Sequence, residues 1–167
     1  MDRIIKRNSK VTILLALVGL VFCACGKKTV FDEYVTIPKD GWHKDSMAVF
    51  NVEIRNAQAI YDLDIKIRNR SDYPNSNLWL FIQVVSPSGV VVQDTLDCIL
   101  ADDQGKWLGS GWGDLFNVNQ SYKREVKFVE SGKYSFRIIQ GMRIEDLNGI
   151  HNIGLCVKEV VVNDDDN

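Results

Sequence analysis

The segment Tyr61-Asp62-Leu63-Asp64-Ile65-Lys66-Ile67-Arg68 alternates apolar and polar side chains without a break. Successive side chains of a β-strand point to opposite faces, so a period of two predicts a strand with one face on a core and the other in water. The four apolar residues would form the core face, and the four charged residues the solvated face. The same alternation over residues 48–54 and 133–140 predicts two more half-buried strands.

Residues 78–85 are nearly all apolar, which is typical of a strand covered on both faces and places Trp79 in the core. The turn residues Ser86-Pro87-Ser88-Gly89 follow, and the strand pattern at 90–100 completes a predicted hairpin. Further strands are predicted at 122–128 and 149–162, and a short helical turn could occupy 143–147. About seven or eight strands at this spacing predict an all-β fold, an antiparallel β-sandwich.

Length and composition limit the class of protein. A chain of 167 residues has room for one compact domain and little more. With 46% hydrophobic and 25% charged residues, the composition excludes collagen-like, coiled-coil and wholly disordered chains. The formal net charge of −2 argues against nucleic acid as a partner, because holding phosphates requires a basic face.

The N-terminus has the layout of an export signal. A basic segment, residues 1–10, precedes the uncharged run VTILLALVGLVF at 11–22. That run is shorter than the roughly 20 residues of a membrane-spanning helix. The following junction, Phe22-Cys23-Ala24-Cys25-Gly26, resembles a bacterial lipobox, in which a cysteine after small residues is acylated before the signal is removed.

Cys25 fits that pattern better than Cys23, because Ala24 is small whereas Phe22 is bulky. We therefore predict lipidation at Cys25, with soluble secretion or an uncleaved anchor as the alternatives. The predicted organisation is a cleaved signal peptide at 1–24, a lipid-anchored tether and edge segment at 25–44, a β-sandwich domain at 45–162 and an acidic tail at 163–167. Acyl chains on Cys25 would hold the protein on a membrane.

Two further cysteines, Cys98 and Cys156, each lie in an apolar run. An exported compartment permits a disulfide between them, but two small buried thiols fit the pattern equally well. No CxxC pair and no pair of histidines at ligand spacing occurs in the sequence, so a zinc site is not expected. The two histidines, His43 and His151, lie in a charged loop and at a strand entry.

The stretch GKWLGSGWGD at 105–114 places two tryptophans among glycines. Trp107 and Trp112 could form an exposed aromatic platform for a sugar ring or a partner's side chain. The favoured interpretation is structural: a wide turn whose tryptophans plug the end of the sandwich. Trp42, like Trp79, is predicted to be a core residue.

Catalytic motifs are absent from the sequence: no G-x-S-x-G, H-E-x-x-H or Walker loop occurs. The acid pairs Asp62/Asp64 and Asp102/Asp103 could imitate a glycosidase couple, but solvated strand and turn positions explain them better. We predict no catalytic residue, no metal, no cofactor and no small-molecule substrate.

The order of several short motifs is similar to that of the gliding-motility lipoprotein GldH family of the Bacteroidota. After the lipobox come Tyr61-Asp62-Leu63, Leu78-Trp79-Leu80-Phe81-Ile82, Ser86-Pro87-Ser88-Gly89, Gly105-Lys106-Trp107-Leu108-Gly109, Gly113-Asp114-Leu115-Phe116, Gly132-Lys133-Tyr134-Ser135-Phe136 and Leu147-Asn148-Gly149-Ile150. The resemblance implies a lipid-anchored accessory protein of the gliding apparatus, linked to type IX secretion, and no catalytic residues. The Gly-Lys-Lys-Thr that follows Cys25 lacks an acidic cluster resembling a surface-export tag, which favours the periplasmic side of the outer membrane.

The leading hypothesis is therefore a membrane-tethered β-sandwich that docks on other envelope proteins without catalysis. The alternative is a carbohydrate-binding outer-membrane lipoprotein that uses Trp107 and Trp112. A hydrolase assembled from distant loops is a third hypothesis, and it has no motif behind it.

Overall fold

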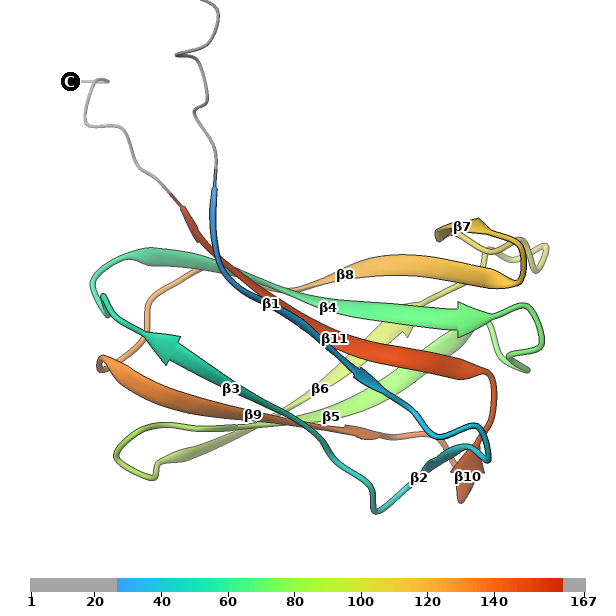
Figure 1. Cartoon of the computed structure of the whole chain (residues 1–167), viewed down its shortest axis with the longest axis horizontal. Coiled ribbons are helices and arrows are strands. Elements are labelled where there is room, and N and C mark those ends of the chain that lie inside the picture. Colours follow the sequence, from blue (N-terminus) through green and yellow to red (C-terminus); the bar gives the residue numbers. More distant parts are fainter. Residues whose placement is uncertain (1–26, 161–167) are drawn as a thin grey trace, which may run out of the picture.

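The computed structural model describes residues 27–160, which fold into two packed antiparallel sheets (Figure 1). The predicted signal peptide, Cys25 and the acidic tail lie outside the described residues. The strands are β1 (Lys28–Thr36), β2 (Trp42–His43), β3 (Ala48–Ile54), β4 (Ile60–Arg70), β5 (Asn77–Val85), β6 (Val91–Ile99), β7 (Ser110–Trp112), β8 (Leu115–Val126), β9 (Gly132–Gln140), β10 (Asp146–Leu147) and β11 (Ile150–Val160).

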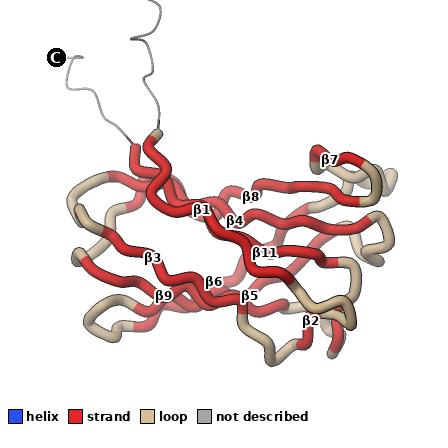
Figure 2. Tube along the Cα trace, in the orientation of Figure 1, coloured by secondary structure: helices blue, strands red, loops and turns tan. Residues whose placement is uncertain are grey.

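A five-stranded sheet and a four-stranded sheet form the two layers of the sandwich. The five-stranded sheet has the order β1-β11-β4-β8-β7, and the four-stranded sheet the order β3-β9-β5-β6. The short strands β2 and β10 pair with each other at one end. Strands and short loops account for the described chain (Figure 2), and no helix able to cross a membrane occurs between residues 27 and 160. The predicted all-β antiparallel sandwich is confirmed.

The core lies between the two sheets and follows the alternation that the sequence predicts. β3 covers the predicted residues 48–54 and alternates strictly between buried and exposed positions. Tyr61, Leu63, Ile65 and Ile67 of β4 face the core, as predicted. Trp42 is also buried, and its indole Nε1 donates a hydrogen bond to the Ser46 carbonyl oxygen at 2.9 Å. These inward rows supply the apolar burial that stabilises the sandwich.

The predicted hairpin after residue 85 is also confirmed. β5 pairs with β6 along its whole length, and the Ser86 N–H donates to the Val90 carbonyl oxygen across the turn. Gly89 has a φ of 86°, a backbone conformation that glycine adopts without steric cost.

The prediction that β5 is covered on both faces was wrong. Its core face is buried, but Trp79 and Phe81 on the other face are 41% and 51% exposed. β5 lies inside the four-stranded sheet between β9 and β6, and only one face of that sheet meets the other layer. The apolar run therefore combines a core row with an exposed apolar row.

The proposed helical turn at 143–147 is not formed: bends at 143 and 145 lead into the short strand β10. Asp146 and Leu147 pair with His43 and Trp42 as β10, and the Lys44 N–H donates to the Glu145 carbonyl oxygen at 2.8 Å. The Gln140 amide Nε2 donates to the Ile144 carbonyl oxygen, also at 2.8 Å. The Lys44 backbone and the Gln140 side chain thus satisfy carbonyl groups that a helical turn would have bonded to its own backbone.

β1 begins at Lys28 and forms one edge of the five-stranded sheet, where it pairs with β11. The aromatic and aliphatic residues at 31–37 thus pack as an edge strand, as expected for the later part of the segment 25–44. Lys28 lies opposite Glu159, so the beginning of β1 and the end of β11 leave the sandwich at the same end (Figure 1).

Candidate functional site

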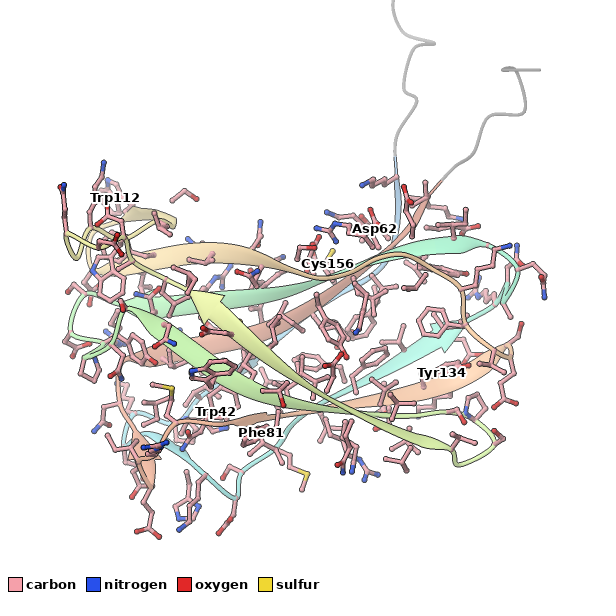
Figure 3. All side chains as sticks on the ribbon, turned by 180° about the vertical axis from the view of Figure 1, so that it is seen from behind. Trp42, Asp62, Phe81, Trp112, Tyr134 and Cys156 are labelled. Atoms are coloured by element: carbon pink, nitrogen blue, oxygen red, sulfur yellow. The ribbon has the colours of Figure 1, made fainter. Side chains whose placement is uncertain are left out.

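The two tryptophans of the glycine-rich stretch do not form one aromatic platform. Trp107 packs against the core beside Tyr73 and Phe116, with ring centroids 6.4 and 5.7 Å away. Trp112 lies at the β7–β8 tip and is 96% exposed, at the end of the sandwich away from the chain ends (Figure 3). Trp107 thus packs at the end of the sandwich, whereas the exposed indole of Trp112 does not fill the end of the sandwich.

The outer face of the four-stranded sheet carries an exposed apolar surface. The register places Ile139, Phe81 and Thr95 side by side across β9, β5 and β6. Trp79 lies two residues before Phe81 on the same face, and Figure 3 shows Phe81 on the side of β5 away from the other sheet. We call this surface the apolar face. Its members are Met47, Val49, Trp79, Phe81, Ile99 and Ile139.

The apolar face has fixed geometry around its two aromatic residues. Gly141 lies beneath them: a Cβ there would come within 3.1 Å of the Phe81 ring and 3.3 Å of the Trp79 Cβ. The Gly141 N–H donates to the Trp79 carbonyl oxygen at 2.7 Å, and the Met142 sulfur accepts from the Trp79 N–H at 3.4 Å. The backbone beneath the exposed rings is therefore held in place.

The outer face of the five-stranded sheet has the opposite character, because ion pairs cover it. Asp62 pairs with Lys27, and Asp64 with Arg124 and Lys158. The expectation that Asp62 and Asp64 face water was wrong: both are buried by these long cationic side chains. Their role as structural ion-pair partners explains both aspartates without assigning them to a catalytic carboxylate pair of a glycosidase.

Tyr34 orders the neighbouring part of that charged face. Its ring lies between two cations, with Lys66 Nζ at 4.5 Å and Arg68 Cζ at 4.1 Å from the ring centroid. Lys66 also donates to Asp32 at 2.7 Å. The ring covers Gly154 so closely that a Cβ there would approach Tyr34 Cδ1 to 2.7 Å. These contacts leave the charged face with side chains already paired to one another.

Asp62 links the start of the described chain to the end of β8. Its carboxylate accepts from Lys27 Nζ and from the Glu125 N–H, the latter at 2.9 Å. Glu125 has a φ of 51° and lies where the β4–β8 register shifts, so the carboxylate stabilises an irregular strand end. Burial raises the pKa of Asp62, but the Lys27 and Glu125 hydrogen bonds and nearby cations outweigh it and lower the pKa below its ordinary value.

Acid should therefore weaken the fold through Asp62. A carboxyl whose pKa is lower in the folded state contributes stability above its ordinary pKa of about 3.9, and that contribution is lost as pH falls through this value and below it. We expect the free energy of unfolding, from urea titrations, to fall between about pH 5 and pH 3, and to fall less in Asp62→Asn. Some decline should persist in the variant, because Asp94 also has a lowered pKa from its hydrogen bond with Lys123. Equal slopes for both proteins would contradict this role of Asp62.

The two cysteines lie in different sheets, and each carries a free thiol in the described structure. Cys98 of β6 faces the core, opposite Leu78. Cys156 of β11 lies opposite Asp32 and Asp64, in the outward row of the five-stranded sheet. The disulfide left open by the sequence is not formed here, because the two side chains point away from a common space. Burial raises the pKa of Cys98 to about 12 and also raises that of Cys156, which favours the protonated thiol at both positions.

The histidines take part in local polar contacts. His43 lies 3.8 Å from carboxylate oxygens of both Asp45 and Glu145, and His151 Nδ1 contacts the amide oxygen of Asn152. Over residues 27–160, no group of three or more side chains of the metal-ligating types comes together.

Comparison with known proteins identifies the family of this chain. A family model described as GldH lipoprotein matches residues 29–157, nearly the whole sandwich. The chain belongs to the GldH lipoprotein family. It is 41% identical over 147 residues to the gliding motility lipoprotein GldH homolog of Christiangramia forsetii, covering 84% of this chain and 90% of that protein. It is 33% identical over 153 residues to the gliding motility lipoprotein GldH of Flavobacterium johnsoniae, covering 87% and 94%.

The resemblance inferred from the order of motifs is thus confirmed. The sequence did not reveal which motif residues of this GldH-family chain are exposed. Trp79 and Phe81 lie in the motif Leu78-Trp79-Leu80-Phe81-Ile82, for which the sequence predicts a strand covered on both faces, with Trp79 in the core. The strict alternation of large aromatic and aliphatic residues was the available signal, because such alternation also fits an exposed apolar row on a half-buried strand.

Proposed function

We propose that this GldH-family chain is a non-catalytic docking module of the gliding-motility and type IX secretion apparatus, tethered by acyl chains on Cys25. The outer membrane is its site, with the sandwich on the periplasmic side. The names of the two relatives support the gliding role. The observation that carries the docking role is the apolar face, a cluster of large apolar side chains exposed on a rigid sheet.

The chemistry of the apolar face suits contact with another protein. Trp, Phe and Met are enriched in the cores of protein interfaces, where a few such anchors account for most of the binding energy. Polar residues border the apolar face, including Asp97, opposite Trp79 in the register, and Arg137, which donates to Gln83 at 3.1 Å. An apolar centre with a polar border is typical of a protein-binding patch.

The tether proposed at Cys25 would hold the sandwich close to the membrane. Only Gly26 separates Cys25 from Lys27, whose ammonium group is paired with Asp62. The apolar face belongs to the opposite sheet from the one that receives β1. A partner could therefore reach the apolar face while the anchor stays in the bilayer.

Affinity capture of the full, lipidated chain from envelope fractions tests this function. We expect the double variant Trp79→Ser/Phe81→Ser to recover about tenfold less of any envelope partner than the wild type, the effect of losing a hot spot. Trp112→Ser is the control, because it removes an aromatic side chain that is more exposed than Trp79 or Phe81 and belongs to another surface. Equal capture by the double variant and the control would contradict docking through the apolar face.

The anchor is tested in the same fractions. Cys25→Ala should remove the labelled palmitate. The variant should then be found either in the soluble fraction or as a form that retains its signal peptide. Unchanged palmitate labelling in Cys25→Ala would overturn the lipidation site without affecting the test of the apolar face.

A further inference from the structure

A second apolar feature lies between the sheets, at the end of the sandwich where β1 begins. It is a cavity of about 320 Å³, open to solvent on one side and lined by residues of β4, β5, β6, β8 and β9. Its walls include Leu63, Val84, Val92, Val126, Phe136 and the ring of Tyr122. Phe136, Val84 and Val92 lie side by side across β9, β5 and β6 and form its floor. In Figure 3 this end is marked by Tyr134, another of its lining residues.

The cavity opens between the edge strand β6 and the end of β8. β6 is the edge of the four-stranded sheet, and β8 departs from regular pairing with β4 near Glu125. Val90, Val92 and Val129 stay exposed at the mouth, although β-branched apolar residues in these places would pack against a closed sheet. The gap is thus an unfilled part of the core.

Further along the gap, a salt bridge closes it. Lys123 of β8 pairs with Asp94 of β6, and this hydrogen bond from Lys123 lowers the pKa of Asp94. Beside this pair, burial raises the pKa of Tyr122 to about 12. A flexible chain that enters from the end of the sandwich leaves this ion pair intact. The shape therefore suits a thin aliphatic occupant.

The lining chemistry agrees with that shape. The walls are almost entirely aliphatic and aromatic, so a sugar or another polar ligand would lose hydrogen bonds on entry without replacement. The polar groups are at the rim: Lys123, Lys127, Glu130, Ser86 and Ser88. Glu130 is already bonded to the Ser88 N–H at 3.0 Å, and Lys123 to Asp94, which leaves the ammonium group of Lys127 to face an anionic headgroup.

The cavity is also near the proposed anchor. Lys27, two residues from Cys25, is bonded to Asp62; Asp62 accepts from the Glu125 N–H; and the next residue, Val126, lines the cavity. The mouth therefore lies at the end of the sandwich that the anchor holds toward a membrane, where phospholipids are abundant.

We propose that this cavity holds one acyl chain of a bilayer phospholipid, with the phosphate beside Lys127. A volume near the lower end of the range for small-molecule sites, about 300–1,000 Å³, suits a single aliphatic chain. Filling it restores the packing contacts that an empty apolar cavity lacks. This site is distinct from the apolar face, and it shares only the membrane tether with the docking function proposed above.

Photo-crosslinking in vesicles tests the proposal. The full lipidated chain is reconstituted into phosphatidylethanolamine–phosphatidylglycerol vesicles that contain a tracer phospholipid with a diazirine in one acyl chain. After irradiation, adducts are mapped by peptide mass spectrometry. We expect them on the cavity walls, at Val84, Val126 and Phe136, and few on Phe81 of the apolar face.

Two variants of neighbouring residues provide the matched comparison. Val92→Trp fills the mouth, whereas Val91→Trp places the same side chain on the opposite face of the same edge strand. Cavity adducts should fall about tenfold in Val92→Trp, equivalent to about 1.4 kcal/mol, and stay unchanged in Val91→Trp. Melting temperatures of both variants show that the fold is retained.

Three results would overturn the proposal. Adducts unchanged in Val92→Trp would exclude the cavity as their source. Adducts as frequent on Phe81 as on the cavity walls would show contact with the bilayer at large. For the third result, the anchor is acylated in cells with the photoreactive chain, and the protein is placed in unlabelled vesicles. A crosslink from this acyl chain to the cavity walls would show that the occupant is the anchor itself. Because the readout is a lipid adduct, none of these results depends on whether the apolar face captures a partner.

Discussion

Trp42→Ala is expected to lower the free energy of unfolding by about 3–5 kcal/mol, the range for truncating a fully buried aromatic side chain. Trp42 is only 1% exposed, and it belongs to the core that both sheets share. The substitution also leaves the Ser46 carbonyl oxygen without the indole hydrogen bond. Urea denaturation followed by circular dichroism measures the loss.

Trp112→Ala is the control for that experiment. At 96% exposure, its indole has almost no contacts to lose, and the expected change is within about 0.5 kcal/mol. Losses of similar size in both variants would mean that Trp42 does not occupy the core position described here.

Gly149→Ala should have the next largest effect, about 2–5 kcal/mol, from two additive causes. Gly149 has a φ of 86°, which costs an L-residue about 1–2 kcal/mol. Its Cβ would also approach the Tyr73 Cα to 2.5 Å, and this part of the backbone is fixed because the Arg70 N–H donates to the Gly149 carbonyl oxygen at 2.7 Å. Tyr73 is buried and cannot move aside cheaply.

Gly89→Ala separates these two causes. Gly89 has the same φ of 86°, but no heavy atom lies within 4 Å of the Cβ position. The substitution there therefore lowers the free energy of unfolding through backbone strain alone. The difference between the two variants in urea denaturation should therefore be about 1–3 kcal/mol, the cost of overpacking. Equal destabilisation would show that the β4–β5 loop yields to the added methyl group.

Local periodicity predicted much of this fold because the apolar residues that alternate along the strands occupy the buried positions. β3 and the core face of β4 follow the period of two, and the β5–β6 turn follows from proline and glycine chemistry. These features depend on residues close in the sequence.

The differences arise where distant partners decide the outcome. Trp79 is exposed because the other sheet covers only one face of β5, and periodicity does not specify which apolar row is covered. Asp62 and Asp64 are buried because Lys27 and cations of β8 and β11 lie over them. Asp146 and Leu147 are extended because they pair with a segment about a hundred residues earlier.

The candidate sites were harder to predict than the strands for the same reason. Trp107 and Trp112 share one glycine-rich stretch, yet one packs inward and the other projects from a hairpin tip. The cavity between β6 and β8 is lined by ordinary strand valines whose sequence pattern does not distinguish a filled gap from an open one. Residue types alone do not report the spacing of two sheets.

The antiparallel ladder between β1 and β11 determines how the molecule would bear tension from its tether. A pull applied at Lys28 along β1 runs perpendicular to the ladder hydrogen bonds, so they are sheared together (Figure 1). A sideways pull would instead open the same bonds one after another, as a zipper opens. A tether at Cys25, as proposed above, would therefore meet its greatest resistance when it pulled in line with β1.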